Sequence, residues 1–137
     1  RQLHKCIVDD RAHAVFNGKV FVHKAAQLTN AGQLNKNLLL SSKARVDTKP
    51  QLEIVADNVK CTHGATVGQL DADEVFYLQS RGIDAVSARN LLVYAFAYEI
   101  FDCIPVASLK KLLADQLCLL RCKFDPSCSV QPVHSMH

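Results

Sequence analysis

The chain has 137 residues, a length that suits one domain with a hydrophobic core. Hydrophobic residues make up 49% and charged residues 21%, which is typical of a folded globular protein and excludes a disordered one. The formal charge of +3 comes from scattered basic residues and tryptophan is absent, so we expect no nucleic-acid partner.

No targeting or membrane segment is evident. The longest apolar run, residues 90–98, is much shorter than the roughly 20 residues that a membrane-spanning helix needs, so we expect no membrane partner. The sequence starts at Arg1 without a methionine or a signal peptide, and we expect the chain to be a piece of a longer protein. Six cysteines at irregular spacing, with no C-x-x-C pair, favour reduced thiols over a disulfide framework.

Short runs of β-forming residues follow one another between residues 14 and 69. They lie at 14–16, 19–22, 37–40, 44–46, 52–55 and 59–61. Asn17-Gly18, between the first two runs, predicts a tight turn. Strands at this frequency fit a sandwich, a barrel or a stacked β-solenoid, and no repeat of fixed period is evident that would choose among them.

The next part of the chain has a helical pattern. Asp71, followed three residues later by Glu74, resembles a capping box at the start of a helix, and Arg81-Gly82 predicts its end. Asp84 can cap a second helix, which Pro105 would end.

A third helix is predicted after Pro105, because leucines recur there at three- and four-residue spacing (Leu109, Leu112, Leu113, Leu117 and Leu120). Strands followed by helices predict an α+β fold. We therefore divide the chain into a strand region at residues 1–70, a helical region at 71–124 and a flexible tail at 125–137.

Cys61 and His63 form the strongest candidate site. Side chains alternate along a strand, so these two residues would point to the same face if the segment is extended. A thiolate and an imidazole suit iron or another transition metal, although two ligands do not complete a site. The alternative is a half-buried cysteine beside a hydrogen-bonded histidine.

Two other groups of residues suggest different chemistry. Cys61 as nucleophile, His63 as base and Asp57 as orienting residue would make a cysteine hydrolase, but no oxyanion hole is apparent. A zinc site could use the C-terminal residues Cys118, Cys122, Cys128, His134 and His137, whose spacing is looser than usual. No glycine-rich phosphate loop is present in the sequence.

Four segments, read in order, resemble a known family. They are residues 37–41, 44–54, 59–68 (Val-Lys-Cys-Thr-His-Gly-Ala-Thr-Val-Gly) and 76–83 (Phe-Tyr-Leu-Gln-Ser-Arg-Gly-Ile). The series is similar to the SufB/SufD family of iron–sulfur cluster assembly scaffold proteins, and residues 49–54 and 59–68 favour its SufD branch over its SufB branch. The resemblance covers about residues 13–105, and the tail after Lys123 matches nothing in it.

The resemblance implies a fold and partners. Residues 1–70 would be C-terminal rungs of a right-handed parallel β-helix that pairs with SufB, and residues 71–124 would be a helical region that docks the ATPase SufC. The chain would be a non-catalytic scaffold in the bacterial cytoplasm or the plastid stroma. Alone, its open β-helix end would favour self-pairing, including a homodimer.

The resemblance also implies the site. His63 would be a ligand for iron or for a transient iron–sulfur cluster shared with SufB, and Cys61 a second cluster-binding residue whose role is less defined. The remaining ligands would come from the partner. The alternative is a purely structural partner of SufB and SufC that never touches metal.

Overall fold

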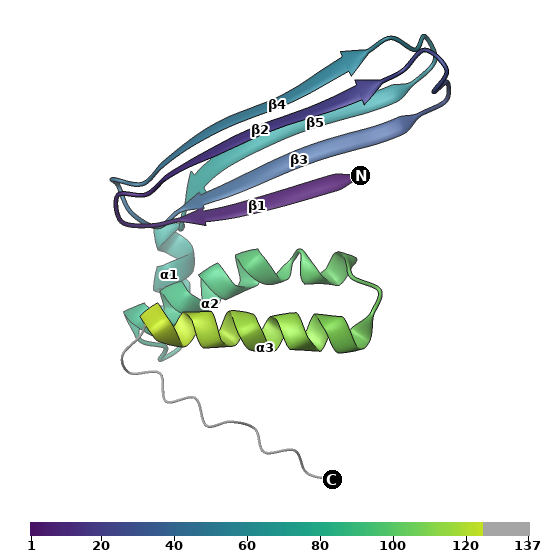
Figure 1. Cartoon of the computed structure of the whole chain (residues 1–137). Coiled ribbons are helices and arrows are strands. Elements are labelled where there is room, and N and C mark those ends of the chain that lie inside the picture. Colours follow the sequence, from purple (N-terminus) through teal and green to yellow (C-terminus); the bar gives the residue numbers. More distant parts are fainter. Residues whose placement is uncertain (125–137) are drawn as a thin grey trace. The chain divides into compact units, whose positions relative to one another are not determined.

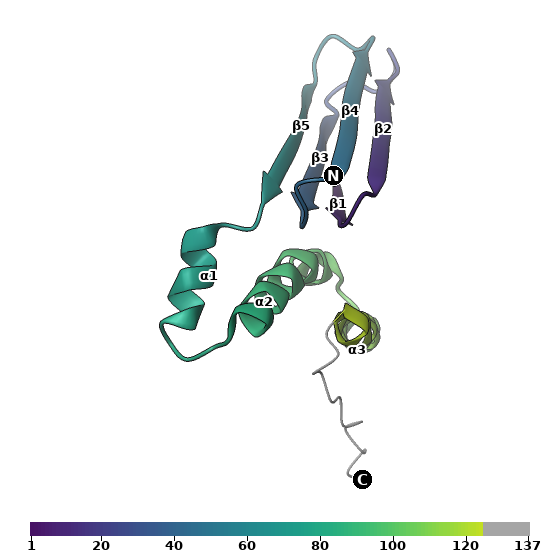
Figure 2. The same ribbon diagram turned by 90° about the vertical axis from the view of Figure 1, so that its left-hand side faces the viewer.

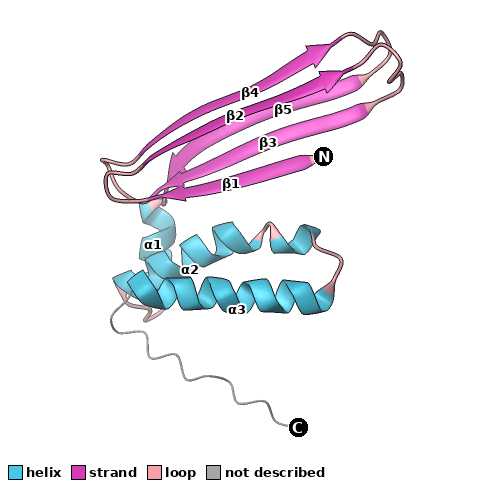
Figure 3. Ribbon diagram, viewed as in Figure 1, coloured by secondary structure: helices cyan, strands magenta, loops and turns pink. Residues whose placement is uncertain are grey.

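The computed structural model describes residues 1–124, with side chains up to residue 117. It divides into two compact units, Arg1–Leu70 and the residues from Asp71 onward, and each unit is treated by itself below. Within the described residues, five strands precede three α-helices, as Figure 3 shows by colour. The expected α+β class is therefore confirmed, with parallel strands in its sheets.

The strand unit consists of two parallel sheets. Its strands are β1 (Gln2–Val8), β2 (His13–Val22), β3 (Asn30–Leu39), β4 (Arg45–Ile54) and β5 (Lys60–Gln69). One sheet has the order β1-β3-β5 and the other the order β2-β4. Consecutive strands therefore lie alternately in one sheet and the other, and the two layers can be followed in Figures 1 and 2.

The strand pairs share a nearly constant spacing along the chain. Gln2 pairs with Gln33, His13 with Arg45 and Asn30 with Lys60, so partners are 31, 32 and 30 residues apart. The sequence analysis missed this spatial repeat. The number of residues between paired strands is nearly constant, but the residue types at paired positions differ, so no repeated sequence pattern is visible.

The predicted turn at Asn17-Gly18 is wrong. β2 runs without interruption through both residues and pairs with β4 along its whole length. A Cβ atom at Gly18 would lie 2.7 Å from Cζ of Phe16 and 2.8 Å from Nε2 of Gln33. Glycine leaves room here for the Phe16 ring and the Gln33 amide, and the backbone does not turn.

Three amide side chains line the interior face of β3. Gln33, Asn35 and Asn37 are 4%, 1% and 3% exposed, at alternate positions of the strand. Asn35 Oδ1 accepts hydrogen bonds from Asn37 Nδ2 at 2.5 Å and from Thr48 Oγ1 of the other sheet at 2.7 Å. The space between the sheets is therefore partly polar, and hydrogen bonds link several of its polar groups.

The helical unit contains α1 (Ala72–Gln79), α2 (Ala85–Tyr98), the short 3-10 helix η1 (Phe101–Cys103) and α3 (Ala107–Phe124). Both predicted N-caps are confirmed: Asp71 accepts from the backbone N–H of Asp73, and Asp84 from those of Val86 and Ser87. Gly82 follows α1 with a φ of +88°. α2 ends at Tyr98, before the predicted limit at Pro105, and η1 fills part of the interval.

Aromatic side chains connect the end of α2 with η1. The rings of Tyr94 and Tyr98 stack at 5.5 Å, and Phe101 meets Tyr98 edge-on at 5.6 Å. The ammonium group of Lys110 lies 5.4 Å from the Tyr98 ring, so α3 contacts this cluster as well.

Among residues 1–124, no helix combines the length and the apolar character that crossing a bilayer requires.

Candidate functional site

β5 carries both residues of the main candidate site at an edge of its sheet. Among the described strands it pairs with β3 alone, so Cys61 lies beside Ala31 and His63 beside Gln33. His63 is exposed and Cys61 is half-buried. The prediction that this segment is an extended strand is confirmed, and both side chains occupy positions of the same parity.

The imidazole ring of His63 is anchored by one of its nitrogens. Nδ1 lies 3.0 Å from the backbone carbonyl oxygen of Pro50 in β4. A carbonyl oxygen can only accept, so Nδ1 carries the proton and donates it. In the neutral ring Nε2 then holds the lone pair, which is the arrangement that metal-binding histidines adopt when a backbone carbonyl fixes their second nitrogen.

Pro50 suits the strand that supplies this carbonyl. β4 pairs only with β2 among the described strands, so it is an edge strand, where a residue without an N–H group is tolerated. A proline in the middle of β4 provides no donor for a further strand at this point, and its carbonyl oxygen is occupied by His63. At Pro50, the imidazole ring of His63 is therefore the group that hydrogen-bonds to the backbone of β4.

His63 belongs to a layer of the strand unit, by which we mean a row of residues that are paired with one another in the strand register and not one of the two sheets. Gln2, Gln33 and His63 are aligned across β1, β3 and β5, while Gly18 and Pro50 are aligned across β2 and β4. The hydrogen bond from His63 to Pro50 and the close approach of Gly18 to Gln33 join the two sets across the interior. Sequence reasoning found only His63, because nothing in the spacing along the chain relates these five positions.

The described part of the chain does not form a complete metal site by itself. Among the side chains that the structure describes, up to residue 117, no three histidine, cysteine or acidic groups come together as a possible metal-binding group. The chemistry of His63 and Cys61 nevertheless fits iron or an iron–sulfur cluster, since imidazole nitrogen and thiolate sulfur are both ligands of iron. Any such site at β5 needs ligands from outside the described chain.

The hydrolase hypothesis finds no support in the geometry. Its orienting carboxylate, Asp57, does not hold His63, because the Nδ1 nitrogen is bonded to the Pro50 carbonyl. Cys61, Cys6 and Cys103 are free thiols. For the zinc hypothesis, the side chains of Cys118 and Cys122 and all of Cys128, His134 and His137 lie outside the described residues, so it stays a prediction.

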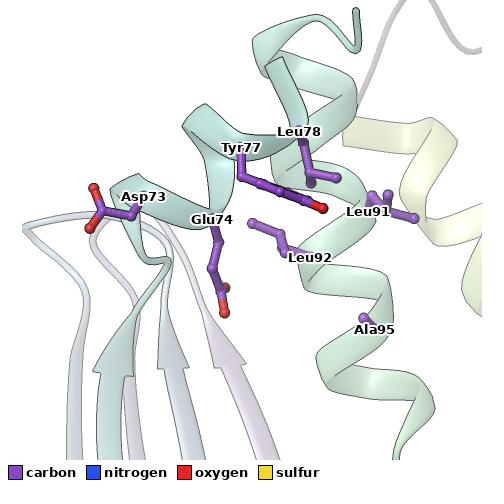
Figure 4. Close-up of a pocket in the computed structure, with 7 residues that line it drawn as sticks. All are labelled: Asp73, Glu74, Tyr77, Leu78, Leu91, Leu92 and Ala95. Atoms are coloured by element: carbon purple, nitrogen blue, oxygen red, sulfur yellow. The ribbon is translucent and has the colours of Figure 1, made fainter. Parts of the chain in front are cut away.

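A groove between α1 and α2 was not predicted. Tyr77, Leu78, Leu91, Leu92 and Ala95 give it apolar walls, and Asp73 and Glu74 add carboxylates from the first turn of α1. Figure 4 shows the Tyr77 ring reaching across from α1 toward Leu91 and Leu92 of α2. Nearby Phe76 is 70% exposed, so α1 presents apolar surface outward as well. The leucine spacing in α2 gave the only signal, and it predicts a core equally well.

The fold and the site together define a protein with parallel β-sheets, an edge strand that carries His63 and Cys61, and a helical unit. Residues 1–96 match the family model described as "SUF system FeS cluster assembly, SufBD core domain". The chain therefore belongs to the SufBD family, which acts in iron–sulfur cluster assembly, and the resemblance seen in the sequence is confirmed.

Individual relatives agree with this assignment. The chain is 70% identical over 109 residues to the iron-sulfur cluster assembly SufBD family protein slr0076 of Synechocystis, covering 80% of this chain and 24% of the relative. It is 51% identical to the iron-sulfur cluster assembly protein SufD of Escherichia coli, covering 81% and 26%. It is also 51% identical to the chloroplastic protein ABCI7 of Arabidopsis thaliana, covering 77% and 22%. The chain spans about a quarter of the length of these relatives.

Proposed function

We propose that the chain is part of a non-catalytic scaffold for iron–sulfur cluster assembly in which His63 is a ligand of iron or of the nascent cluster. One observation carries the proposal: Nδ1 is anchored to Pro50, which directs the lone pair to Nε2 on an exposed edge strand. The cluster is cargo that must be handed on. A site to which this chain contributes His63, with Cys61 as a second candidate, suits such temporary binding.

The remaining ligands come from SufB in this proposal. The strand unit would be the last rungs of a right-handed parallel β-helix, which accords with strands that alternate between two parallel sheets every 30 to 32 residues. The unpaired edge of β5 exposes Ala65, Thr66 and Val67 beside His63. A partner strand there would cover this edge and bring its own ligands to the imidazole. Without the partner, the same edge favours self-pairing into a homodimer.

The helical unit would dock the ATPase SufC. The groove between α1 and α2 supports this part, since Leu91 and Leu92 are available to an apolar side chain. Asp73 and Glu74 would favour basic residues around that side chain. The named relatives come from bacteria and from a chloroplast, so we propose the bacterial cytoplasm or the plastid stroma as the location.

Anaerobic cluster reconstitution on the complex co-expressed with SufB and SufC tests the role of His63. His63→Ala should leave the complex intact and reduce iron and sulfide loading severalfold. His13→Ala is the matched control, because His13 is also an exposed strand histidine but bonds Asp47 on β4 at 2.8 Å. Equal loading of wild type and His63→Ala would favour the second candidate function, a purely structural partner of SufB and SufC without metal contact.

A further inference from the structure

Gln33 shares a register column with His63 and has an unused acceptor. Its side chain is 4% exposed, and its Nε2 donates to Oε1 of Gln2 on β1 at 2.9 Å. Its own Oε1 is buried and accepts no hydrogen bond from any described residue. A buried oxygen in this condition costs free energy unless a water molecule or a ligand supplies a donor.

The direction of this oxygen follows from the amide ladder. When amide side chains stack along a parallel sheet, each N–H faces one neighbouring strand and each carbonyl oxygen faces the other. Nε2 of Gln33 faces Gln2 on β1, so the oxygen is directed toward the β5 side of the column, where His63 is the paired residue. Nε2 of His63 is an acceptor too, because Nδ1 holds the proton. Two acceptors thus belong to residues that are paired in the strand register.

Gly18 maintains this arrangement from the opposite sheet. Any side chain at position 18 would begin 2.7 Å from Cζ of Phe16 and 2.8 Å from Nε2 of Gln33, so the amide would have to shift together with the Phe16 ring. Glycine inside a strand is less favourable than alanine. The strand therefore loses stability at Gly18, where the absence of a side chain leaves room for the Gln33 amide.

We propose that Gln33 is a positioning residue of the His63 site, whose buried oxygen accepts a hydrogen bond from a water molecule held beside His63 Nε2. Water has the two donor hydrogens that two acceptors require. When a metal ion occupies Nε2, a water ligand of that metal donates to Gln33 instead. This inference rests on the proposed function of His63 and extends it to a residue in the interior.

Asn37 provides a matched control inside the same strand. It is 3% exposed, and its Oδ1 is also buried without a partner in the described chain. Its register column contains Cys6 and Val67, so no histidine faces that oxygen. Replacing Gln33 with methionine or Asn37 with leucine removes one such oxygen while keeping the approximate shape of the side chain.

Titration with Co²⁺, followed by its visible absorption, tests the proposal on the complex co-expressed with SufB and SufC, because the remaining metal ligands come from SufB in the proposed function. We expect Gln33→Met to weaken Co²⁺ binding about tenfold, as loss of an outer partner of a metal site does, and to shift the absorption bands. Asn37→Leu should leave both unchanged. Gly18→Ala is the second variant, and it should weaken binding by moving the Gln33 amide while every ligand stays in place.

The outcomes separate the two proposals. If His63→Ala binds Co²⁺ as the wild type does, the metal role of His63 fails. If His63→Ala loses binding while Gln33→Met and Gly18→Ala keep wild-type affinity and spectrum, the role of Gln33 is refuted alone. Should Gln33→Met not fold, by far-UV circular dichroism, the Gly18→Ala titration decides the question.

Discussion

The partly buried hydrogen bond between Asn35 and Thr48 should be a main link between the two sheets. Asn35 is 1% exposed, and its Oδ1 accepts from the hydroxyl of Thr48 at 2.7 Å and from the amide of Asn37. Asn35→Ala removes both bonds. Asn37 keeps a partner, because its Nδ2 also donates to the carbonyl of Thr66 at 3.0 Å, whereas the Thr48 hydroxyl has no second acceptor among the described residues.

The expected cost follows from this asymmetry. A lost bond whose donor keeps another partner costs about 1 kcal/mol, and a buried donor left without an acceptor costs about 1–3 kcal/mol. We therefore expect Asn35→Ala to lower the free energy of unfolding by about 3 kcal/mol. Thr48→Val removes the hydroxyl with little change of shape and should cost about 1 kcal/mol.

A double-mutant cycle in urea, followed by far-UV circular dichroism, measures the link directly. In the Thr48→Val background Asn35→Ala no longer strands a hydroxyl, so its cost should fall by about 1–2 kcal/mol. A control cycle pairs Asn35→Ala with Thr62→Val, since Thr62 lies near Gly32 on the opposite face of the strands. Additive costs in the Asn35–Thr48 cycle would refute the reasoning.

Two further predictions concern the helical unit. Hydrogen bonds from Ser87 hold the pKa of Asp84 below its usual 3.8. This N-cap therefore stabilises α2 above pH 3.8 and loses its effect as the pH falls through the lowered pKa. Asp84→Ala should reduce helicity at neutral pH and remove this acid dependence, both measured by circular dichroism. Leu91→Lys, which puts a charge into the groove, should weaken SufC binding at least tenfold in calorimetry, whereas Val106→Lys, at an exposed position outside the groove, should not.

The helix starts could be predicted because their causes are local. Asp71 and Asp84 each bond backbone N–H groups two or three residues ahead, and such contacts depend only on neighbouring sequence. The long strands were harder to predict. The runs at 44–46 and 52–55 belong to a single strand, β4, because the edge of a sheet tolerates the proline between them.

The polar interior explains why the β3 strand was only partly predicted. Apolar alternation marks a buried face, but the buried positions of β3 include Gln33, Asn35 and Asn37. Their burial becomes favourable only through partners on other strands, such as Gln2 and Thr48. Those partners lie 31 and 13 residues away, so no local pattern contains the information.

Three departures from the usual rules for strands coincide in the layer of His63. A glycine stands inside β2, a proline inside β4 and a buried amide inside β3, at Gly18, Pro50 and Gln33. Each choice is unfavourable or neutral for a strand by itself. Together they admit the amide, leave a carbonyl for the imidazole ring, and put a residue with an unused acceptor at the register position paired with His63. Natural proteins accept such local costs mainly at functional sites, so the cluster of exceptions is independent support for a function at His63.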